Sequence, residues 1–280
     1  MGAILVRYSE IGLKGKNRTF FENKLVNNIG ECMKKNKIKF TNIHKIRGRI
    51  IFYAQDKAVN YLKEIFGISS ISVAKEADLN LEEIKKEVEK ICKRQVFKTF
   101  RISVQRLNKA FPLKSTQLEA DLGSFVVEMF GKKVKLEEPD LNICVEITDN
   151  AYVFTRTIPG FGGLPISTQG RVVSLIEDKN SLLATILIMK RGCSVTLVGF
   201  KSFNVGPIKR FAYGFKVRFI KIKQFEDIDK IAKRHEAKAL VVGQTLENIK
   251  NLETELLVLR PIVGYSKQEL NNIYEQFGIK

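Results

Sequence analysis

Seven residues near the middle of the chain, PGFGGLP at positions 159–165, place three glycines between two prolines. Proline lacks a backbone donor and glycine has no preferred conformation, so helices and strands rarely continue through such a segment. We therefore expect the main domain boundary here. A chain of 280 residues is also long enough for two or three compact domains, each with its own core.

Strand-like and helical segments alternate in the half of the chain after this boundary. Short apolar runs of strand length are separated by segments whose apolar residues have helical spacing. Such alternation is typical of a doubly wound parallel sheet. We therefore predict an α/β domain over residues 161–280. Its expected elements are, in order, 172–176, 182–191, 194–200, 217–222, 228–235 and 239–242.

The half before the boundary mixes strands and helices in another order, which predicts two smaller α+β domains over residues 1–60 and 61–160. The clearest predicted strand of this half is the segment 97–105, where apolar and polar residues alternate as in a half-buried strand. The expected elements are 3–8, 18–35, 49–53 and 58–66, then 68–75, 81–94, 97–105, 118–130, 143–147 and 152–158.

The charge favours a polyanionic partner. The formal net charge is +18, and each cation placed near a phosphate releases counterions. The alternative is a merely lysine-rich surface. No lipidation signal, membrane-spanning run or signal peptide is expected, so a membrane partner is not predicted. The four cysteines form no C-x-x-C pair, which indicates neither a disulfide framework nor a metal site and fits the cytoplasm.

A basic loop, RLNKAFPLKS at 106–115, is the first candidate RNA-binding surface. Cations there would pair with phosphates, and an aromatic side chain would stack on a base. Phe100 alternates with apolar neighbours and is expected in the core, whereas Phe111 fits either the core or a base. The predicted tRNA-binding residues of this region are Arg101, Arg106, Lys109, Phe111 and Lys114.

Two further basic segments are candidates for RNA contact. Arg47 and Arg49 flank a glycine at the start of a strand, where two cations would be fixed in space. Lys14, Lys16 and Arg18 lie at a turn before a helix, where backbone N–H groups could add an anion site. The alternatives are a solvated charged surface for the first segment and an ordinary start of a helix for the second.

Several blocks of the sequence, in order along nearly the whole chain, resemble the tRNA 4-thiouridine synthetases, a family of tRNA sulfurtransferases. This resemblance implies an N-terminal ferredoxin-like domain, then a THUMP domain that binds tRNA, then an ATP-pyrophosphatase domain of PP-loop type. In that family the third domain adenylates a uridine at the eighth tRNA position so that sulfur replaces oxygen. The blocks are RYSEIGLKGKNR (7–18), FGISSIS (66–72), RLNKAFPLKS (106–115), FGGLPISTQG (161–170), LIMKRGCSV (187–195) and LRPIVGYSKQEL (259–270).

The PP-loop of the family, S-G-G-x-D-S, is replaced here. The matching stretch places Glu177 and Asp178 at the glycine positions and Asn180 at the Asp position, so Ser181 alone is kept. Two carboxylates would repel a triphosphate, and side chains would obstruct the backbone N–H groups that bind it. If a nucleotide site persists, the resemblance places it at Ser174, Leu175, Ser181, Gly199, Phe200, Gly243 and Gln244.

Other parts of the catalytic domain also depart from the family. The block G-x-S-x-G-Q-x-x-S-Q-T is compressed to residues 242–246, and the chain between 200 and 239 is shorter and lacks an Arg-Arg-x-Met stretch. Sulfur transfer needs a thiolate carrier, yet Cys193 is the one cysteine after the boundary and is expected to be a small buried side chain.

Two functions remain open from the sequence. The first is a tRNA-binding protein that does not adenylate tRNA, needs no cofactor and works with a separate tRNA-modifying enzyme or as a homodimer. The second is an active sulfurtransferase that uses ATP with Mg²⁺ and makes 4-thiouridine at tRNA position 8. A methyltransferase or deaminase with a THUMP domain is a weaker third reading, because G-x-G-x-x-G and H-x-E with P-C-x-x-C are absent.

Overall fold

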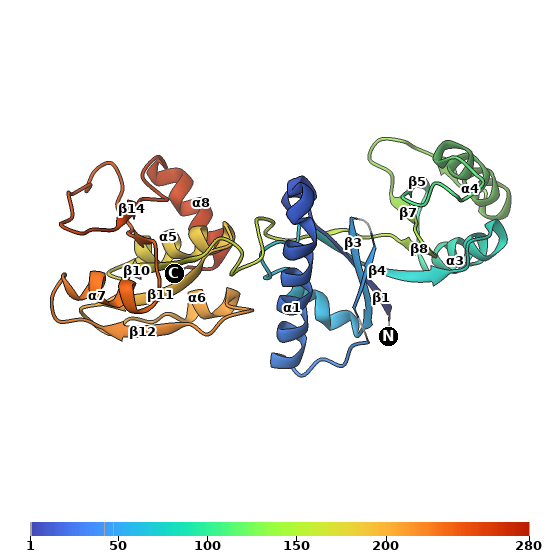
Figure 1. Cartoon of the computed structure of the whole chain (residues 1–280). Coiled ribbons are helices and arrows are strands. Elements are labelled where there is room, and N and C mark those ends of the chain that lie inside the picture. Colours follow the sequence, from blue (N-terminus) through green and yellow to red (C-terminus); the bar gives the residue numbers. More distant parts are fainter. Residues whose placement is uncertain (1, 42, 47, 280) are drawn as a thin grey trace. The chain divides into compact units, whose positions relative to one another are not determined.

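The computed structural model describes residues 2–41, 43–46 and 48–279. The chain forms two compact units, and Figure 1 shows the helices and strands along it. The first unit consists of Met1–Arg7, Ile38–Val59 and Ser70–Pro159, and the second of Tyr8–Lys37, Asn60–Ser69 and Gly160–Lys280. Among the described residues, the helices are too short or too polar to cross a bilayer.

A continuous nine-stranded sheet runs through the first unit, in the order β2-β3-β1-β4-β8-β7-β5-β6, with β9 also paired to β4. Strand β4 joins its two halves, because β4 pairs antiparallel with β1 at Ala3↔Ala74 and with β8 at Lys75↔Val153. The strands are β1 (Gly2–Arg7), β2 (His44–Ile46), β3 (Arg49–Ala54), β4 (Ser70–Ala77), β5 (Thr99–Arg106), β6 (Lys133–Val134), β7 (Leu141–Ile147), β8 (Ala151–Phe154) and β9 (Ile158–Pro159).

Helices α3 (Leu81–Arg94) and α4 (Ser115–Phe130) share a core with strands β5, β7 and β8. Asn80 caps α3 by accepting a hydrogen bond from the Glu83 N–H at 2.8 Å. Phe100, on the inward face of β5, is fully buried in this core, as its alternation predicts, whereas Arg101 on the opposite face is exposed. The orientation of β5 therefore determines which side chains of this region reach solvent.

The second unit contains α1 (Arg18–Lys35) and a five-stranded sheet in which each paired strand is parallel to its neighbour, in the order β12-β11-β10-β13-β14. The strands are β10 (Arg171–Leu175), β11 (Ser194–Gly199), β12 (Arg218–Lys221), β13 (Ala239–Val241) and β14 (Leu257–Leu259). The helices of this part are α5 (Lys179–Lys190), α6 (Gly206–Phe211), α7 (Asp227–Arg234) and α8 (Lys267–Phe277).

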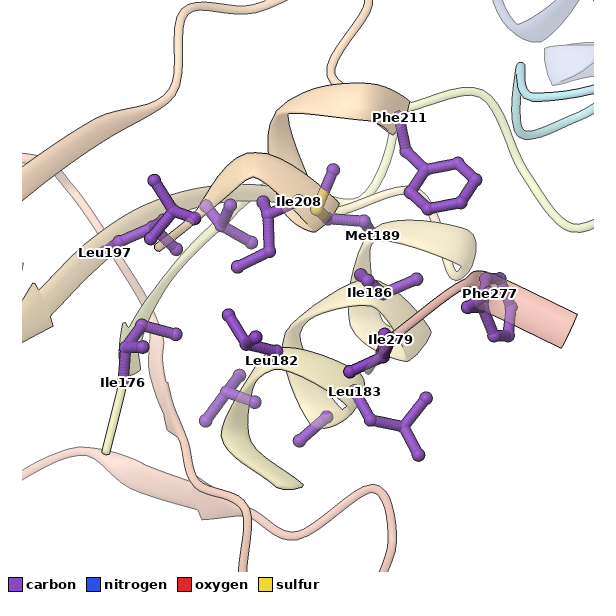
Figure 2. Packing of buried hydrophobic residues seen from close by; sticks show 14 of the residues in the cluster. Ile176, Leu182, Leu183, Ile186, Met189, Leu197, Ile208, Phe211, Phe277 and Ile279 are labelled. Carbon is purple, nitrogen blue, oxygen red and sulfur yellow. The ribbon is translucent and has the colours of Figure 1, made fainter. Parts of the chain in front are cut away.

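Helices cover both faces of this parallel sheet. Val172 and Leu197 point to the face where α5, α6 and α8 pack, and Figure 2 shows the side chains of that core. Val173 and Leu240 point to the opposite face, where Ile228 of α7 packs. The sheet is therefore doubly wound, as the alternation of strands and helices predicts.

Aromatic side chains fix the glycine- and proline-rich segment within the second unit. Phe161 stacks on Phe277 with ring centres 4.9 Å apart, and Phe66 stacks on Phe211 at 5.1 Å. The backbone adds two hydrogen bonds of 2.8 Å, from Gly67 N to Gly162 O and from Gly162 N to Ile68 O. From Gly160 onward, the segment that divides the chain in sequence is thus a packed part of the second unit.

Some elements differ from the prediction. The helix expected over 58–66 is the single turn α2 (Val59–Leu62), because Gly67 and its neighbours form turns instead. The strand expected over 152–158 is divided into β8 and β9. Strands β2, β6 and β14 and helices α6 and α8 are additional to the predicted elements.

Candidate functional sites

The loop after β5 presents two exposed lysines, Lys109 and Lys114. On β5 itself, the exposed Arg101 donates a hydrogen bond to the Leu136 carbonyl at 3.1 Å. These three cations, all in the first unit, keep an accessible positive charge that phosphates can approach.

Two other residues predicted for this surface have structural roles. The Arg106 guanidinium donates to the carbonyl oxygens of Phe111 at 3.0 Å and Leu113 at 2.9 Å, so it holds the loop. The Phe111 side chain is only 5% exposed and packs in the core shared by α3, α4 and β5. Core packing covers the Phe111 ring, which agrees with the alternative of a core residue and gives no support to the predicted base-stacking role.

Arg49 is also not available to RNA. Its side chain is buried, and its Nε lies 2.6 Å from Oε2 of Glu146. Arg7 approaches the same carboxylate, with Nε 2.8 Å from Oε1, and Gln105 accepts a further hydrogen bond from Arg49 at 2.7 Å. These contacts tie β1, β3, β5 and β7 together and occupy the Arg49 guanidinium, so the structure does not support the expected RNA contact of Arg49. Arg47 lies outside the described residues.

The turn before α1 contains three more predicted cations, which lie in the second unit. Arg18 pairs with Glu22 at 2.7 Å and donates to the Tyr8 hydroxyl at 2.8 Å. Burial, followed by the hydrogen bond to Glu22, raises the pKa of Tyr8. Lys14 lies over the Phe21 ring at 5.0 Å, whereas Lys16 is exposed. Arg18 and Lys14 thus stabilise the start of the helix, and Lys16 stays accessible to an anion.

The loop that corresponds to the family PP-loop is closed on itself. Ser181 Oγ accepts hydrogen bonds from Glu177 N at 2.9 Å and Asp178 N at 3.0 Å. Asp178 Oδ1 in turn accepts one from Ser181 N at 2.8 Å, which makes Asp178 the N-cap of α5. Three backbone N–H groups that face an anion in a phosphate-binding loop are therefore occupied by the chain's own side chains.

The β13–α8 side of the sheet lies against this loop. A Cβ added to Gly243 would be 2.3 Å from Ser181 N and 2.6 Å from Asn180 C, so the backbone there touches the start of α5. The Tyr274 hydroxyl also donates to Asn180 Oδ1. Phosphates seated against residues 177–181 would have to displace these contacts.

A cavity of about 230 Å³ remains beside the loop. It brings together four of the predicted nucleotide-binding positions, Leu175, Phe200, Gly243 and Gln244. Glu177 and Asp178 line the same cavity, and burial, followed by the charge of Asp178, raises the pKa of Glu177. Sequence reasoning missed Phe225, Asn248, Lys250 and Leu252, which carry no motif, and Val242 completes the lining.

The other predicted nucleotide-binding positions are enclosed. Ser174 is fully buried, and its hydroxyl lies 2.5 Å from Thr185 Oγ1. Ser181 is 1% exposed and engaged in the cap, and Gly199 packs so closely that a Cβ would lie 2.8 Å from the Ile176 carbonyl oxygen. The prediction that these three residues contact a nucleotide is not supported, because Ser174 and Gly199 are enclosed by neighbouring residues and Ser181 is held in the cap of α5.

All four cysteines are free, and burial raises the pKa of each thiol. For Cys32 and Cys92 the pKa reaches about 11. Cys193 lies just before β11 and packs against the core, but its side chain is only half-buried, whereas a buried one was expected. A raised pKa leaves little thiolate at neutral pH, whereas a sulfur carrier reacts as the thiolate.

Two domain models match the chain, the ThiI ferredoxin-like domain over residues 3–72 and the THUMP domain over residues 79–156. Together with the parallel sheet of the second unit, they define a THUMP-containing protein that ends in an α/β region. The fold class predicted from the sequence is thereby confirmed.

A probable tRNA sulfurtransferase of Thermococcus kodakarensis is 33% identical over 332 residues, which cover 98% of this chain and 87% of the relative. A second, of Caldanaerobacter subterraneus, is 32% identical and covers 98% of this chain and 85% of the relative. The chain belongs to the tRNA sulfurtransferase family. Because each alignment is longer than the 280 residues of this chain, both relatives have segments without a counterpart here.

Two solved structures resemble the fold along its whole length. The crystal structure of PH1313 from Pyrococcus horikoshii Ot3 gives a TM-score of 0.89 at 29% identity and covers 100% of both chains. A 4-thiouridine synthetase solved with RNA and bound ATP gives 0.83 at 25% identity, covering 99% of this chain and 85% of the other.

Proposed function

We propose that this protein binds tRNA and acts in tRNA modification without adenylating tRNA by itself. A THUMP domain supports tRNA binding, as does the relative that was solved with RNA. The exposed Arg101, Lys109 and Lys114 supply cations for the phosphate backbone. The self-capped nucleotide loop supports the further part of the proposal, that a separate enzyme carries out the chemical step.

The observation that carries the proposal is the self-capped start of α5. Glu177 N, Asp178 N and Ser181 N all donate to side chains of the same loop. A triphosphate would have to break these bonds and then lie beside two carboxylates. At close range such repulsion amounts to about 1–4 kcal/mol per pair of charges, depending on the local dielectric.

Calorimetric titration of ATP with Mg²⁺ into the isolated protein tests this proposal. We expect no saturable binding at millimolar ATP, while the same preparation binds tRNA and so proves folded and competent. Micromolar, magnesium-dependent binding of ATP would contradict the proposal that the protein does not adenylate tRNA by itself.

The alternative is an active ATP-dependent sulfurtransferase that makes 4-thiouridine at tRNA position 8. It is favoured by the cavity of about 230 Å³, in which Leu175, Phe200, Gly243 and Gln244 still meet. The titration separates the two functions, because the alternative requires ATP binding, with Mg²⁺, in this cavity or after opening of the loop.

A further inference from the structure

A groove in the second unit gathers lysines from three separate segments of the chain. Its volume is about 450 Å³, and it lies between α1 and the segment from α6 to β12. We call it the basic groove. Its lining residues are Glu31, Lys35, Lys209, Ala212 and residues 214–217.

The basic groove is held in shape by contacts between α1 and Gly214. Glu31 Oε2 accepts a hydrogen bond from Gly214 N at 2.8 Å, and Lys24 Nζ donates to Gly214 O at 3.3 Å. Gly214 has φ +87°, and a Cβ there would lie 2.0 Å from Asn28 Oδ1. Both the positive φ and the close approach to Asn28 require glycine at this position. The two hydrogen bonds then hold the loop against α1.

The charge in the groove is strongly positive. Lys35, Lys209 and Lys216 are exposed, and the one lining carboxylate, Glu31, already accepts the hydrogen bond from Gly214. The surrounding segment 201–225 contains seven Lys and Arg and no Asp or Glu. Ion pairs among the described residues use other cations nearby, such as Arg210 with Glu64 at 2.6 Å. Lys35 lies over the Tyr213 ring at 5.1 Å, a contact that does not neutralise its charge. The three ammonium groups therefore keep a positive charge that an outside anion can approach.

The positive surface continues along β12, which lies at the edge of its sheet and carries the exposed Arg218 and Lys221. Exposed Phe200 and Phe203 follow β11 in the same region of sequence. Cations on an edge strand also discourage pairing with a second sheet, so β12 alone does not identify a ligand. Protection of a sheet edge does not explain the lysines of the basic groove, because they come from α1, α6 and a loop. These lysines therefore favour a bound anion.

We propose that the basic groove binds the phosphate backbone of tRNA, as a contact additional to that of the THUMP domain. This inference rests on the proposed function. Lysine ammonium groups act as point charges that suit phosphates and do not read bases. An acidic protein is the competing partner, and the absence of arginine from the groove lining favours a diffuse phosphate contact over bidentate carboxylate pairing.

The test compares two triple variants of the full chain. Lys35→Gln, Lys209→Gln and Lys216→Gln remove the groove cations. The matched control, Lys230→Gln, Lys233→Gln and Lys267→Gln, removes the same charge from exposed lysines of the second unit that are each paired with a carboxylate. Fluorescence anisotropy with labelled tRNA gives Kd at several salt concentrations, and thermal unfolding verifies the fold of each variant.

We expect the groove variant to bind tRNA about ten-fold more weakly, with a salt slope flatter by about 2, while the control stays near wild type. Equal affinities of groove and control variants would overturn the inference and leave the groove to an acidic protein. If the triple variant fails to fold, Lys216→Glu alone, on an exposed loop, must weaken binding. Absence of tRNA binding by the wild type would instead refute the proposed function itself.

Discussion

Arg106 and Lys109 lie three residues apart in one basic loop, yet their side chains have different environments. The Arg106 guanidinium satisfies two backbone carbonyls, whereas Lys109 is exposed. A cation that bonds the chain contributes to stability, and a solvated cation remains available to a phosphate. Within four positions, the loop therefore contains one cation that stabilises the fold, Arg106, and one that is available to a phosphate, Lys109.

Arg106→Ala should lower the free energy of unfolding by about 1–3 kcal/mol, because two carbonyls lose a charged donor. Lys109→Ala should change it by less than about 0.5 kcal/mol and should instead weaken tRNA binding and flatten its salt slope by about 1. Urea unfolding and anisotropy measured on both variants check this division. Stability lost in Lys109→Ala but not in Arg106→Ala would contradict it.

Among the strands of the first unit, a buried ion-pair network joins residues that are distant in sequence. Glu146 on β7 receives Arg7 from β1 and Arg49 from β3, and the three side chains are largely buried. One carboxylate thus links both halves of the nine-stranded sheet. Removing it would leave two buried guanidinium groups without their shared partner, which is costly in a low dielectric.

Glu146→Gln should therefore reduce the free energy of unfolding by about 3 kcal/mol or more. The matched control is Glu89→Gln, which breaks the more exposed pair with Lys93 and should cost less than about 0.5 kcal/mol. Chemical denaturation compares the two. Similar small losses in both variants would mean that the buried network contributes little to this sheet.

Local patterns predict much of this fold and little of its long-range pairing. The bounds of α1 and α3 agree with the prediction, because the apolar spacing that marks each helix lies within the helix itself. Asn80 caps α3, whereas Asn17 before α1 makes no side-chain cap hydrogen bond. Helix α8 was missed although Ser266 and Glu269 form a capping box, a signal that is visible in the sequence. The pairing of Arg49 with Glu146 spans 97 positions, and no local pattern contains it.

The same limit applies to the candidate sites. Replacement of the PP-loop glycines by Glu177 and Asp178 predicts a changed loop, but not that Ser181 would take up its N–H groups. The lysines of the basic groove come from positions 35, 209 and 216 and converge only in the folded unit. In the structure Lys109 is exposed and Phe111 is buried. The composition of their loop does not predict this difference.

At the scale of the whole molecule, the chain keeps the domain order of a tRNA sulfurtransferase and a net charge of +18. Its exposed cations occur in both compact units, on β5 and the following loop in the first and around the basic groove in the second. The start of α5 is occupied by its own cap. We therefore propose that the protein keeps RNA binding and has lost activation by ATP.

Release of pyrophosphate from ATP, measured with this protein, tRNA and Mg²⁺, tests that claim most directly, because adenylation of tRNA must produce it. A sulfurtransferase with an intact S-G-G-x-D-S loop serves as the positive control under the same conditions. We predict no release above the rate without protein, at concentrations where tRNA is fully bound. Release that depends on tRNA and is catalysed by this protein alone would contradict the account.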